Sequence, residues 1–379
     1  MIRKRFLDFK IIIPILLFFM ISILSIKSAS IYTSKSLGNL VLKQSIWYLV
    51  GISLVIAILY LKNEFFYRYS TIFYIIGNVF LLLLLFFGTP INNSRCWFTI
   101  PGVGSFQPSE FMKIFIMLIL ASSIKKYRLR YLNPTIFQEF MFLVKTFVIV
   151  LIPSILTFLE PDTGAVIIYF IIYFVMLLIS GIRIRWFFCL GGIVLLGLAV
   201  VFGLYFFNSD FFIKMFGTKL FYRLDRIFAW KNGTGLQLEN AIASIGSSGI
   251  IGYGFNKTPI YFPESSTDFI FAVYASNFGF ILSLIFVLLI CFFDLYIIFL
   301  MKKKIDLRDK FILSGISSCL IFQQVQNIGM TIGLFPIAGI TLPFISYGGS
   351  SLLSYMIMIG IVLNITRNKE LKYVHEQKF

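Results

Sequence analysis

The sequence is poor in charged residues and contains a single histidine. Asp, Glu, Lys and Arg together make up 13% of the 379 residues, about half of the roughly 25% that is usual in soluble proteins. This scarcity argues against an ordinary soluble domain. The histidine, His375, lies in the polar C-terminal tail, which argues against a histidine-ligated metal centre and against a Ser-His-Asp triad.

The four cysteines also lack the pattern of a metal site or a disulfide framework. They show no CxxC spacing, and Cys189, Cys291 and Cys319 lie within apolar runs. A cysteine in such a run usually serves as a small hydrophobic residue. We therefore predict neither a metal site nor a disulfide framework from them.

The sequence contains many long apolar runs. Hydrophobic residues make up 59% of the chain, and the mean hydropathy is +0.93. About 17 to 25 apolar residues are enough for a helix to cross a bilayer. We predict an all-α polytopic membrane protein, a single integral membrane domain over residues 1–379. Its roughly ten transmembrane helices are expected near 11–30, 45–61, 67–87, 107–124, 140–159, 164–181, 186–207, 268–300, 310–333 and 349–366.

The first of these runs follows the basic stretch "MIRKRFLDFK". Basic residues before apolar ones also begin a signal peptide. The long run and the lack of an obvious small-residue cleavage site favour a retained first helix.

The basic residues predict how the helices are oriented. The net charge is +17, and lysines and arginines cluster at the N-terminus and after the fourth, sixth, eighth and tenth apolar runs. With ten crossings, all of these clusters fall on one side of the membrane, which is the positive-inside pattern. We therefore expect both termini to be cytoplasmic, and we attribute the charge to topology rather than to a nucleic-acid partner.

Polar connections gather on the opposite side. The longest, about 208–267, is a predicted extracytoplasmic loop between the seventh and eighth helices, and 88–110, 159–164 and 334–351 join it there. These stretches are rich in Gly, Pro, Asn and Ser. Non-helical backbone at membrane depth persists where it is buried in protein or lines a wet cavity, so the sequence predicts a groove or cavity on the external face.

Charged residues near these connections are candidates for a functional site, because charge is costly within a membrane. Glu110 and Lys113 are three residues apart, so on a helix they can form a structural ion pair, or Lys113 can meet an anionic substrate. Arg95, Arg223 and Arg226 lie in external loops. Arg223 and Arg226 can bind phosphate oxygens there, remain solvated or contact lipid headgroups, whereas Arg95 alone indicates little.

Two aspartates stand at predicted helix starts. Asp162 can simply cap the sixth helix. Asp268, in "YFPESSTDFIFAV" (261–273), can be a first-turn charge behind a Ser266 or Thr267 cap. It can also be a general base that faces the predicted cavity, because a carboxylate half out of water has its pKa raised towards a useful range.

Six short motifs occur in order among these spans: "FQPSEFMK" (106–113), "EPDTGA" (160–165), "AIASIGSSGIIGYG" (241–254), "FPESSTDFIFAV" (262–273), "NIGMTIGLFPIAGI" (327–340) and "LPFISYGGSS" (342–351). Together they resemble the SEDS family, the membrane proteins of shape, elongation, division and sporulation that include RodA, FtsW and SpoVE. The similarity covers nearly the whole chain. The fifth motif looks more like the RodA branch than the FtsW branch.

The resemblance implies a peptidoglycan glycosyltransferase. Members of the family polymerise lipid II into glycan strands at the outer face of the bacterial cytoplasmic membrane, beside a class B penicillin-binding protein. The resemblance to the RodA branch implies a role in cell-wall elongation and cell shape, with division and sporulation as alternatives. The expected partners are lipid II, this transpeptidase and membrane lipid, and the possible cofactor is a divalent cation, Mg or Mn.

The resemblance also assigns roles to residues. The aspartate of the family's Thr-Asp-Phe motif corresponds to Asp268, which is therefore the expected catalytic base for the attacking sugar hydroxyl. The residues expected to bind substrate are Arg95, Glu110, Lys113, Asp162, Arg223, Arg226, Glu264, Ser346 and Tyr347.

Three departures from the family pattern affect this expectation. Ser276 and Asn277 replace a Glu-Glu pair, which removes two acids from one helical face. Cys96 stands directly before the loop tryptophan, where the family often has Arg or another polar residue. Ser266 replaces the histidine of a His-Thr-Asp sequence.

Two other functions are compatible with these features. Ten spans with buried charge also suit a lipid II flippase, although the polar residues gather on one side. A scaffold for a penicillin-binding protein, with weak activity, is the other alternative, and the changes at Ser276 and Asn277 motivate it.

Overall fold

The computed structural model describes residues 8–32, 39–91, 94–100, 104–218, 221, 236–304 and 306–367. These residues form ten long helices: α1 (Phe9–Ala29), α2 (Leu40–Arg68), α3 (Ser70–Phe87), α4 (Pro108–Arg130), α5 (Ile136–Leu159), α6 (Thr163–Ser180), α7 (Arg185–Phe207), α11 (Ile270–Lys302), α12 (Leu307–Thr331) and α13 (Gly349–Arg367). They correspond in order to the ten predicted spans. In the described part of the chain, eight of them are long and apolar enough to cross a membrane, which confirms the prediction of an all-α polytopic membrane protein.

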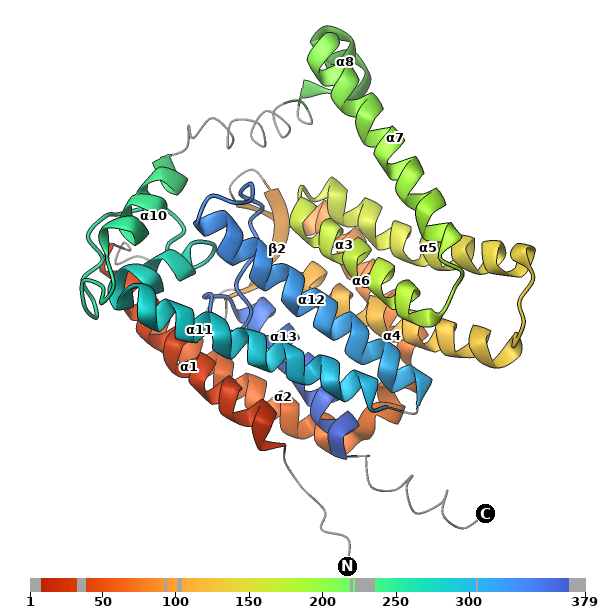
Figure 1. Ribbon diagram of the computed structural model, residues 1–379, viewed down its shortest axis with the longest axis horizontal. Helices are drawn as coiled ribbons and strands as arrows, with labels where there is room; N and C mark the ends of the chain where they lie inside the picture. The colour runs from red at the N-terminus through yellow and green to blue at the C-terminus, as the bar shows by residue number, and fades with distance from the viewer. Residues whose placement is uncertain are drawn as a thin grey trace, which may run out of the picture.

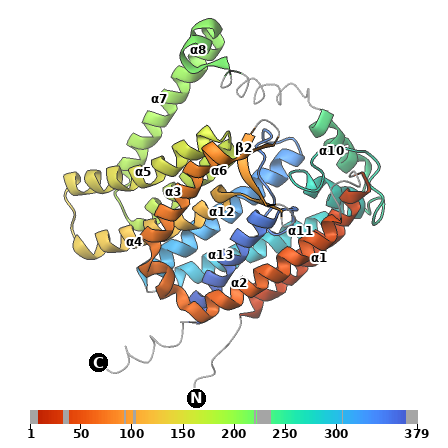
Figure 2. The ribbon, with the colours of Figure 1, turned by 180° about the vertical axis from the view of Figure 1, so that it is seen from behind.

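The two remaining long helices, α4 and α12, are the polar ones. They pack on each other, and both pack on α6. Their polar side chains, such as Lys113, Gln323 and Asn327, are at most 1% exposed. Because protein rather than lipid surrounds these groups, helices of low hydropathy are tolerated at the centre of the bundle. Figures 1 and 2 show the other helices arranged around them.

Shorter elements occupy the connections. They are η1 (Ser30–Tyr32), α8 (Ser209–Phe216), α10 (Leu236–Ser247) and an antiparallel sheet in the order β1–β2–β3, with β1 (Thr89–Ile91), β2 (Ser94–Ile100) and β3 (Gly104–Phe106). The sheet is a correction to the predicted loop over 88–110. Thr, Phe and Trp in β2 suit a strand, and β2 pairs Phe98 with Phe106 of β3.

The predicted loop over 208–267 is likewise not uniform, because it contains α8 and α10. Figure 1 shows α7 and α8 projecting away from the other helices, while α10 lies beside the start of α11. The segment from Ser248 to Gly254 then runs along the first part of α11. Its backbone donates from Tyr253 N to Ser276 O over 3.0 Å and from Gly254 N to Asn277 O over 2.9 Å.

The bundle has two distinct ends. At one, the terminal end, the Tyr296 hydroxyl of α11 donates to Asp8 Oδ2 over 2.6 Å, and Lys304 Nζ donates to the Ile365 carbonyl of α13. The start of α1 and the ends of α11 and α13 therefore lie together there (Figure 1). At the other, the sheet end, lie the sheet, α10 and the connection from α12 to α13.

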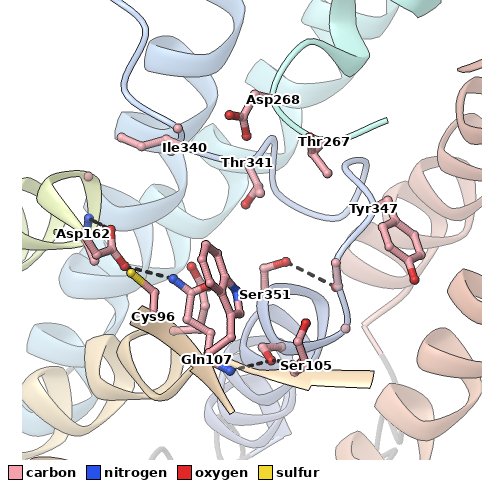
Figure 3. A pocket seen from close by; sticks show the side chains of 18 of the residues that line it. Cys96, Ser105, Gln107, Asp162, Thr267, Asp268, Ile340, Thr341, Tyr347 and Ser351 are labelled. Atoms are coloured by element: carbon pink, nitrogen blue, oxygen red, sulfur yellow. Dashed lines mark hydrogen bonds between the residues drawn. The ribbon is translucent and has the colours of Figure 1, made fainter. Parts of the chain in front are cut away.

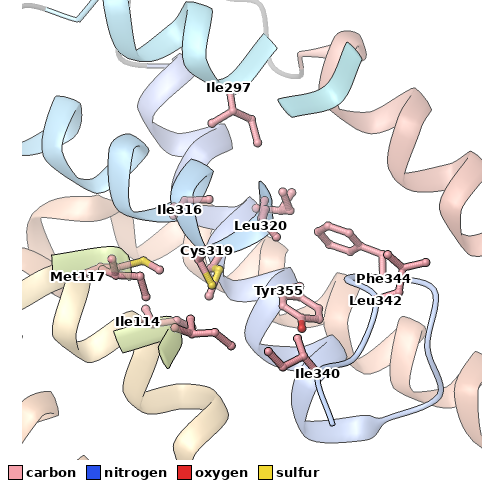
Figure 4. Close-up of a cluster of buried hydrophobic side chains, with 14 of the residues drawn as sticks. Ile114, Met117, Ile297, Ile316, Cys319, Leu320, Ile340, Leu342, Phe344 and Tyr355 are labelled. Atoms are coloured by element: carbon pink, nitrogen blue, oxygen red, sulfur yellow. The ribbon is translucent and has the colours of Figure 1, made fainter. Parts of the chain in front are cut away.

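An aromatic cluster holds the α12–α13 connection in the core. The Phe344 ring stacks on Phe18 of α1 at 5.8 Å between centroids and meets Phe293 of α11 edge-on at 5.9 Å. Figure 4 shows Phe344 and Leu342 beside Tyr355 of α13. The buried Phe344 therefore fixes the residues on either side of it, such as Thr341 and Tyr347, in place.

Candidate active site

A cavity of about 790 Å³ opens at the sheet end of the bundle. Its lining comes from α2, β2, β3 and α12, the first turns of α4, α6 and α13, and the connections before α6, α11 and α13. Figure 3 shows Asp162 and Asp268 reaching it from different elements. The prediction of a cavity built from several polar connections is therefore confirmed.

Asp268 lies in the cavity wall, in the connection immediately before α11. Asn327 of α12 fixes its backbone, because Asn327 Nδ2 donates to the carbonyls of Asp268 and Ile340, each over 2.8 Å. The residue Gly339 packs against its side chain, and a Cβ built at this glycine would lie 3.8 Å from Asp268 Oδ2. Its φ of +64° favours glycine at that position.

The connection before α13 holds the residues that precede Asp268. Ser346 Oγ donates to the Thr267 carbonyl over 2.6 Å, and Tyr347 N donates to the Ser266 carbonyl over 2.8 Å. The alternative in which Ser266 or Thr267 caps α11 is wrong. The N-cap is Phe269, without a side-chain hydrogen bond. Thr267 Oγ1 donates instead to Glu264 Oε2 over 2.6 Å.

Burial of the Asp268 carboxyl group, and secondarily the negative charge of Glu264, raise the pKa of Asp268 to about 7. At neutral pH the group is therefore present in both protonation states. A carboxyl group with a pKa near the working pH is well suited to accept and later release a proton.

Asp162 caps α6 and also lines the cavity. Its Oδ1 accepts from Ala165 N over 3.0 Å, while its Oδ2 accepts from Gln107 Nε2 and Ser109 Oγ at the start of α4, both over 2.9 Å. Burial raises the pKa of Asp162, although these three donors oppose the shift. The side chain thus fastens the first turns of α4 and α6 together beneath the cavity.

Glu160 lies two residues before it and is 1% exposed. Neither of its carboxyl oxygens has a hydrogen-bond partner among the described residues. Burial, followed by the charge of Asp162, raises the pKa of Glu160 to about 9. At neutral pH Glu160 is therefore uncharged, so it does not add a full negative charge beside Asp162.

Glu110 and Lys113 form the predicted ion pair. Lys113 Nζ lies 2.6 Å from Glu110 Oε2, and the Lys113 side chain is fully buried. The ammonium group also lies 5.2 Å from the centroid of the Tyr355 ring. Glu110 lines the cavity and Lys113 does not, so Lys113 neutralises a cavity carboxylate from behind.

The other predicted substrate-binding residues divide into three groups. Glu264 and Tyr347 line the cavity. Ser346 is buried behind the wall, and Arg95 is exposed on β2; neither belongs to the lining. Arg223 and Arg226 lie outside the described residues.

The structure also adds lining residues that the sequence did not single out. They include Lys43 and Trp47 of α2, Gln323 of α12 and Thr341 of the connection before α13. Gln323 Nε2 donates to the Tyr355 hydroxyl over 2.9 Å, which links this wall to the Lys113 environment. The spacing of Lys43 and Trp47, one turn apart on a helix next to the polar connections, was the available signal.

The three departures from the family pattern lie in different surroundings. Ser276 and Asn277 are buried under the segment Ser248–Gly254 and are not part of the cavity lining. Cys96 lines the cavity, and its Sγ donates to the Glu160 carbonyl over 2.8 Å. Ser266 contributes its carbonyl to the contact with Tyr347 N.

The fold and this site define a polytopic α-helical membrane protein with a carboxylate-rich cavity at one end of its helix bundle. The chain belongs to the FtsW/RodA/SpoVE family, described as cell cycle proteins, whose model matches residues 9–371.

Relatives in several branches of this family are similar over most of the chain. A probable peptidoglycan glycosyltransferase FtsW of Haemophilus influenzae is 30% identical and covers 93% of this chain and 88% of its own length. The stage V sporulation protein E of Bacillus subtilis is 32% identical, over 83% and 84%. The peptidoglycan glycosyltransferase MrdB of Helicobacter pylori is 32% identical, over 92% and 88%.

Solved structures share the fold. A chain of a peptidoglycan synthase complex that coordinates polymerisation and crosslinking has a TM-score of 0.77 at 24% identity, covering 96% of this chain and 99% of that chain. The rod shape determining protein RodA of Thermus thermophilus has a TM-score of 0.69 at 24% identity, covering 96% and 98%.

Proposed function

We propose that the chain is a peptidoglycan glycosyltransferase that polymerises lipid II into glycan strands for cell-wall elongation and cell shape. The observation that carries the proposal is Asp268, a carboxyl group in the wall of a large cavity with a pKa of about 7. Relatives named peptidoglycan glycosyltransferase support the reaction. These relatives include FtsW, SpoVE and MrdB at similar identity, so the identities do not separate the branches of the family. The role in elongation is therefore part of the proposal.

The proposed reaction is a single inverting displacement. The Asp268 carboxylate accepts the proton of a sugar hydroxyl of one lipid II molecule as its oxygen bonds to the anomeric carbon of the growing strand. The bond from that carbon to the diphosphate breaks, and polyprenyl diphosphate leaves with the electron pair. One displacement requires no second carboxylate as nucleophile. Holding both lipid-linked substrates in one cavity supplies much of the acceleration.

The proposed location is the bacterial cytoplasmic membrane, with both termini in the cytoplasm and the cavity facing outward. The basic clusters of the sequence support this orientation. We further propose a class B penicillin-binding protein as the partner. The similarity to a chain of a peptidoglycan synthase complex supports an assembly of this kind.

The proposal includes a divalent cation, Mg²⁺ or Mn²⁺, that accompanies the diphosphate. Among the described residues, no group of three or more His, Cys, Asp or Glu side chains could hold a metal ion. We therefore propose that the ion binds mainly through the substrate phosphates. We expect EDTA to slow polymerisation about tenfold or more and Mg²⁺ or Mn²⁺ to restore it. Equal rates with and without EDTA would contradict this part of the proposal.

The flippase and scaffold alternatives receive less support from the structure. The cavity lining comes from the sheet end of the bundle, whereas a carrier needs access from both ends. Ser276 and Asn277, which motivated the scaffold hypothesis, are not among the residues that line the cavity.

The test is polymerisation of labelled lipid II by the purified protein, with and without its cognate penicillin-binding protein. We expect Asp268→Asn to slow strand formation about 10²- to 10⁴-fold, the usual contribution of a general base. The matched control is Asp294→Asn, which removes a largely buried carboxylate within α11, one that is bonded to Gln324 and does not line the cavity. Strands made equally well by the Asp268 variant, or no strands from the folded wild-type complex, would overturn the proposal.

A further inference from the structure

The charges of the cavity lining pose a problem for the proposed substrate. Four carboxylates line it, those of Glu110, Asp162, Glu264 and Asp268. The reaction releases a polyprenyl diphosphate, whose negative charge needs a cationic partner in the same space. Among the described residues that line the cavity, the one lysine or arginine is Lys43.

The cations expected from the sequence do not fill this role in the described part of the chain. Lys113 is fully buried, and its ammonium group is held by Glu110 at 2.6 Å. Arg95 is exposed on β2 and is not part of the lining. Neither side chain is placed to reach a ligand in the cavity without rearrangement.

Lys43 is presented to the cavity by a well-anchored helix end. It lies near the start of α2, where the Asn39 side chain caps the helix by accepting from Leu42 N over 3.1 Å. Trp47, four residues later and on the same face, also lines the cavity. The next residue after Lys43, Gln44, is fully buried and fixes α2 to the α12–α13 connection through a bond from its Nε2 to Ser346 O over 3.2 Å.

Trp47, on the same face of α2 as Lys43, packs against the start of α13. A Cβ built at Gly349 would lie 2.6 Å from Trp47 Cε2, and one at Gly104 would lie 3.4 Å from Trp47 Cζ2. The indole ring therefore packs directly on the backbone of α13 and faces β3. The glycine at 349 is what permits this approach.

The same wall contains the first residues of α13. Gly348, Gly349, Ser350 and Ser351 all line the cavity. The N-terminal end of a helix carries partial positive charge and favours anions. This end therefore adds to the charge of Lys43 on one side of the cavity.

We propose that Lys43 binds the diphosphate of the polyprenyl-linked substrate, on the wall that α2 shares with the start of α13. This inference rests on the proposed function, which supplies the class of substrate. The diphosphate is held on this cationic side, while the reacting sugars lie towards Asp268. Lys43 is then a substrate-binding residue that also stabilises the charge of the departing polyprenyl diphosphate.

The test measures binding rather than turnover. The full-length protein in nanodiscs is titrated with polyprenyl diphosphate, with polyprenyl monophosphate and with inorganic pyrophosphate. We expect Lys43→Met to weaken polyprenyl diphosphate binding about tenfold, the order expected for the loss of one charge-assisted contact. Lys43→Arg should keep most of the affinity, and the monophosphate should lose less than the diphosphate.

The matched control is Lys27→Met. Lys27 is another lysine at the sheet end, in the last turn of α1, with its ammonium group over the Phe255 ring and outside the cavity lining. The Lys27→Met variant should bind polyprenyl diphosphate with the affinity of the wild type. The titrations are repeated with and without phosphatidylglycerol, because a lysine near the membrane surface can also meet lipid headgroups.

Each outcome decides the inference. Unchanged diphosphate affinity in Lys43→Met, or a loss seen only when phosphatidylglycerol is present, would overturn it. A loss equal to that in Lys27→Met would do so as well. Strand formation is measured in parallel. If the wild type forms strands and Lys43→Met binds the diphosphate as tightly as the wild type, the inference alone is rejected. If the wild type forms no strands, the proposed function is rejected.

Discussion

At the residue scale, the proposed reaction uses the carboxyl group of Asp268 as its base. Its backbone is fixed by Asn327 and its neighbours Ser266 and Thr267 by the connection before α13. Burial and the charge of Glu264 set its pKa at about 7. A base must be deprotonated to accept a proton, so the rate of polymerisation should fall as the pH drops below about 7.

Glu264→Gln should move this acidic limb to lower pH. Removing the negative charge stabilises ionised Asp268 and lowers its pKa, while the amide oxygen of glutamine can still accept from Thr267 Oγ1. The measurement is the pH dependence of polymerisation between about pH 5 and 9, in which a one-unit shift changes the ionised fraction about tenfold on the acidic side.

The control for this experiment is Glu239→Gln, a change in the first turn of α10 that lies outside the cavity lining. Its pH profile should coincide with that of the wild type. An acidic limb that stays in place in Glu264→Gln would show that Glu264 does not act on the proposed base, Asp268.

The sequence predicted some of these residues because their surroundings are local. Asp268 stands at the seam between a polar and an apolar stretch, and Glu110 and Lys113 are one helical turn apart. Lys43 was not predicted, because the cavity that it lines is completed by β3 and the start of α13, both distant in sequence. The hydrogen bond from Asn327 to the Asp268 carbonyl likewise joins residues that are distant in sequence, so it could not be predicted from local patterns.

At the element scale, the first part of α2 clamps the connection between α12 and α13. Gln44 Nε2 donates to Ser346 O over 3.2 Å, Gly348 N donates to Gln44 Oε1 over 3.4 Å, and the Tyr48 hydroxyl donates to Phe344 O over 2.5 Å. Ser346 in turn holds Thr267. The position of Asp268 therefore depends on a helix that is more than 200 residues away in sequence.

Gln44→Leu should impair catalysis more than it impairs folding. It leaves the buried Ser346 carbonyl and Gly348 N–H without their partner, which costs about 1–3 kcal/mol of stability. Because the connection also positions Thr267, we expect the turnover number to fall about tenfold with little change in the KM for lipid II. Steady-state polymerisation and thermal unfolding in detergent give the two quantities.

Asn63→Leu is the matched control on the same helix. Asn63 is 2% exposed, and its Nδ2 donates to the Ile361 carbonyl of α13 over 3.1 Å; neither residue lines the cavity. The Asn63→Leu variant should lose about as much stability as Gln44→Leu but keep the turnover number of the wild type. Equal effects of the two variants on turnover would mean that Gln44 acts on stability alone.

Hydrophobic runs predicted the ten long helices to within several residues, because length and composition decide whether a segment can cross a membrane. The run that begins at residue 268 was placed two residues early, since Thr267 bonds to Glu264 instead of capping α11. The sheet was missed because strands as short as Thr89–Ile91 and Gly104–Phe106 carry little periodic signal.

At the scale of the whole molecule, the two ends of the bundle differ in charge and in form. The cavity and its carboxylates lie at the sheet end, while basic residues such as Lys125 and Arg128 lie near the end of α4, which finishes at the terminal end. Lys125 Nζ lies 2.8 Å from Asp306 Oδ2 there. This separation suits an enzyme that takes its substrates from one leaflet and is held in orientation by charge at the other.

The orientation is tested with introduced cysteines in a background where the four native cysteines are replaced by alanine. Leu132, 88% exposed between α4 and α5, and Ile251, 82% exposed before α11, are suitable sites because neither side chain packs in the core. We expect a membrane-impermeant maleimide to label Ile251→Cys in intact spheroplasts and Leu132→Cys after lysis. The opposite labelling would place the cavity in the cytoplasm, where polymerisation of glycan strands outside the cell could not take place.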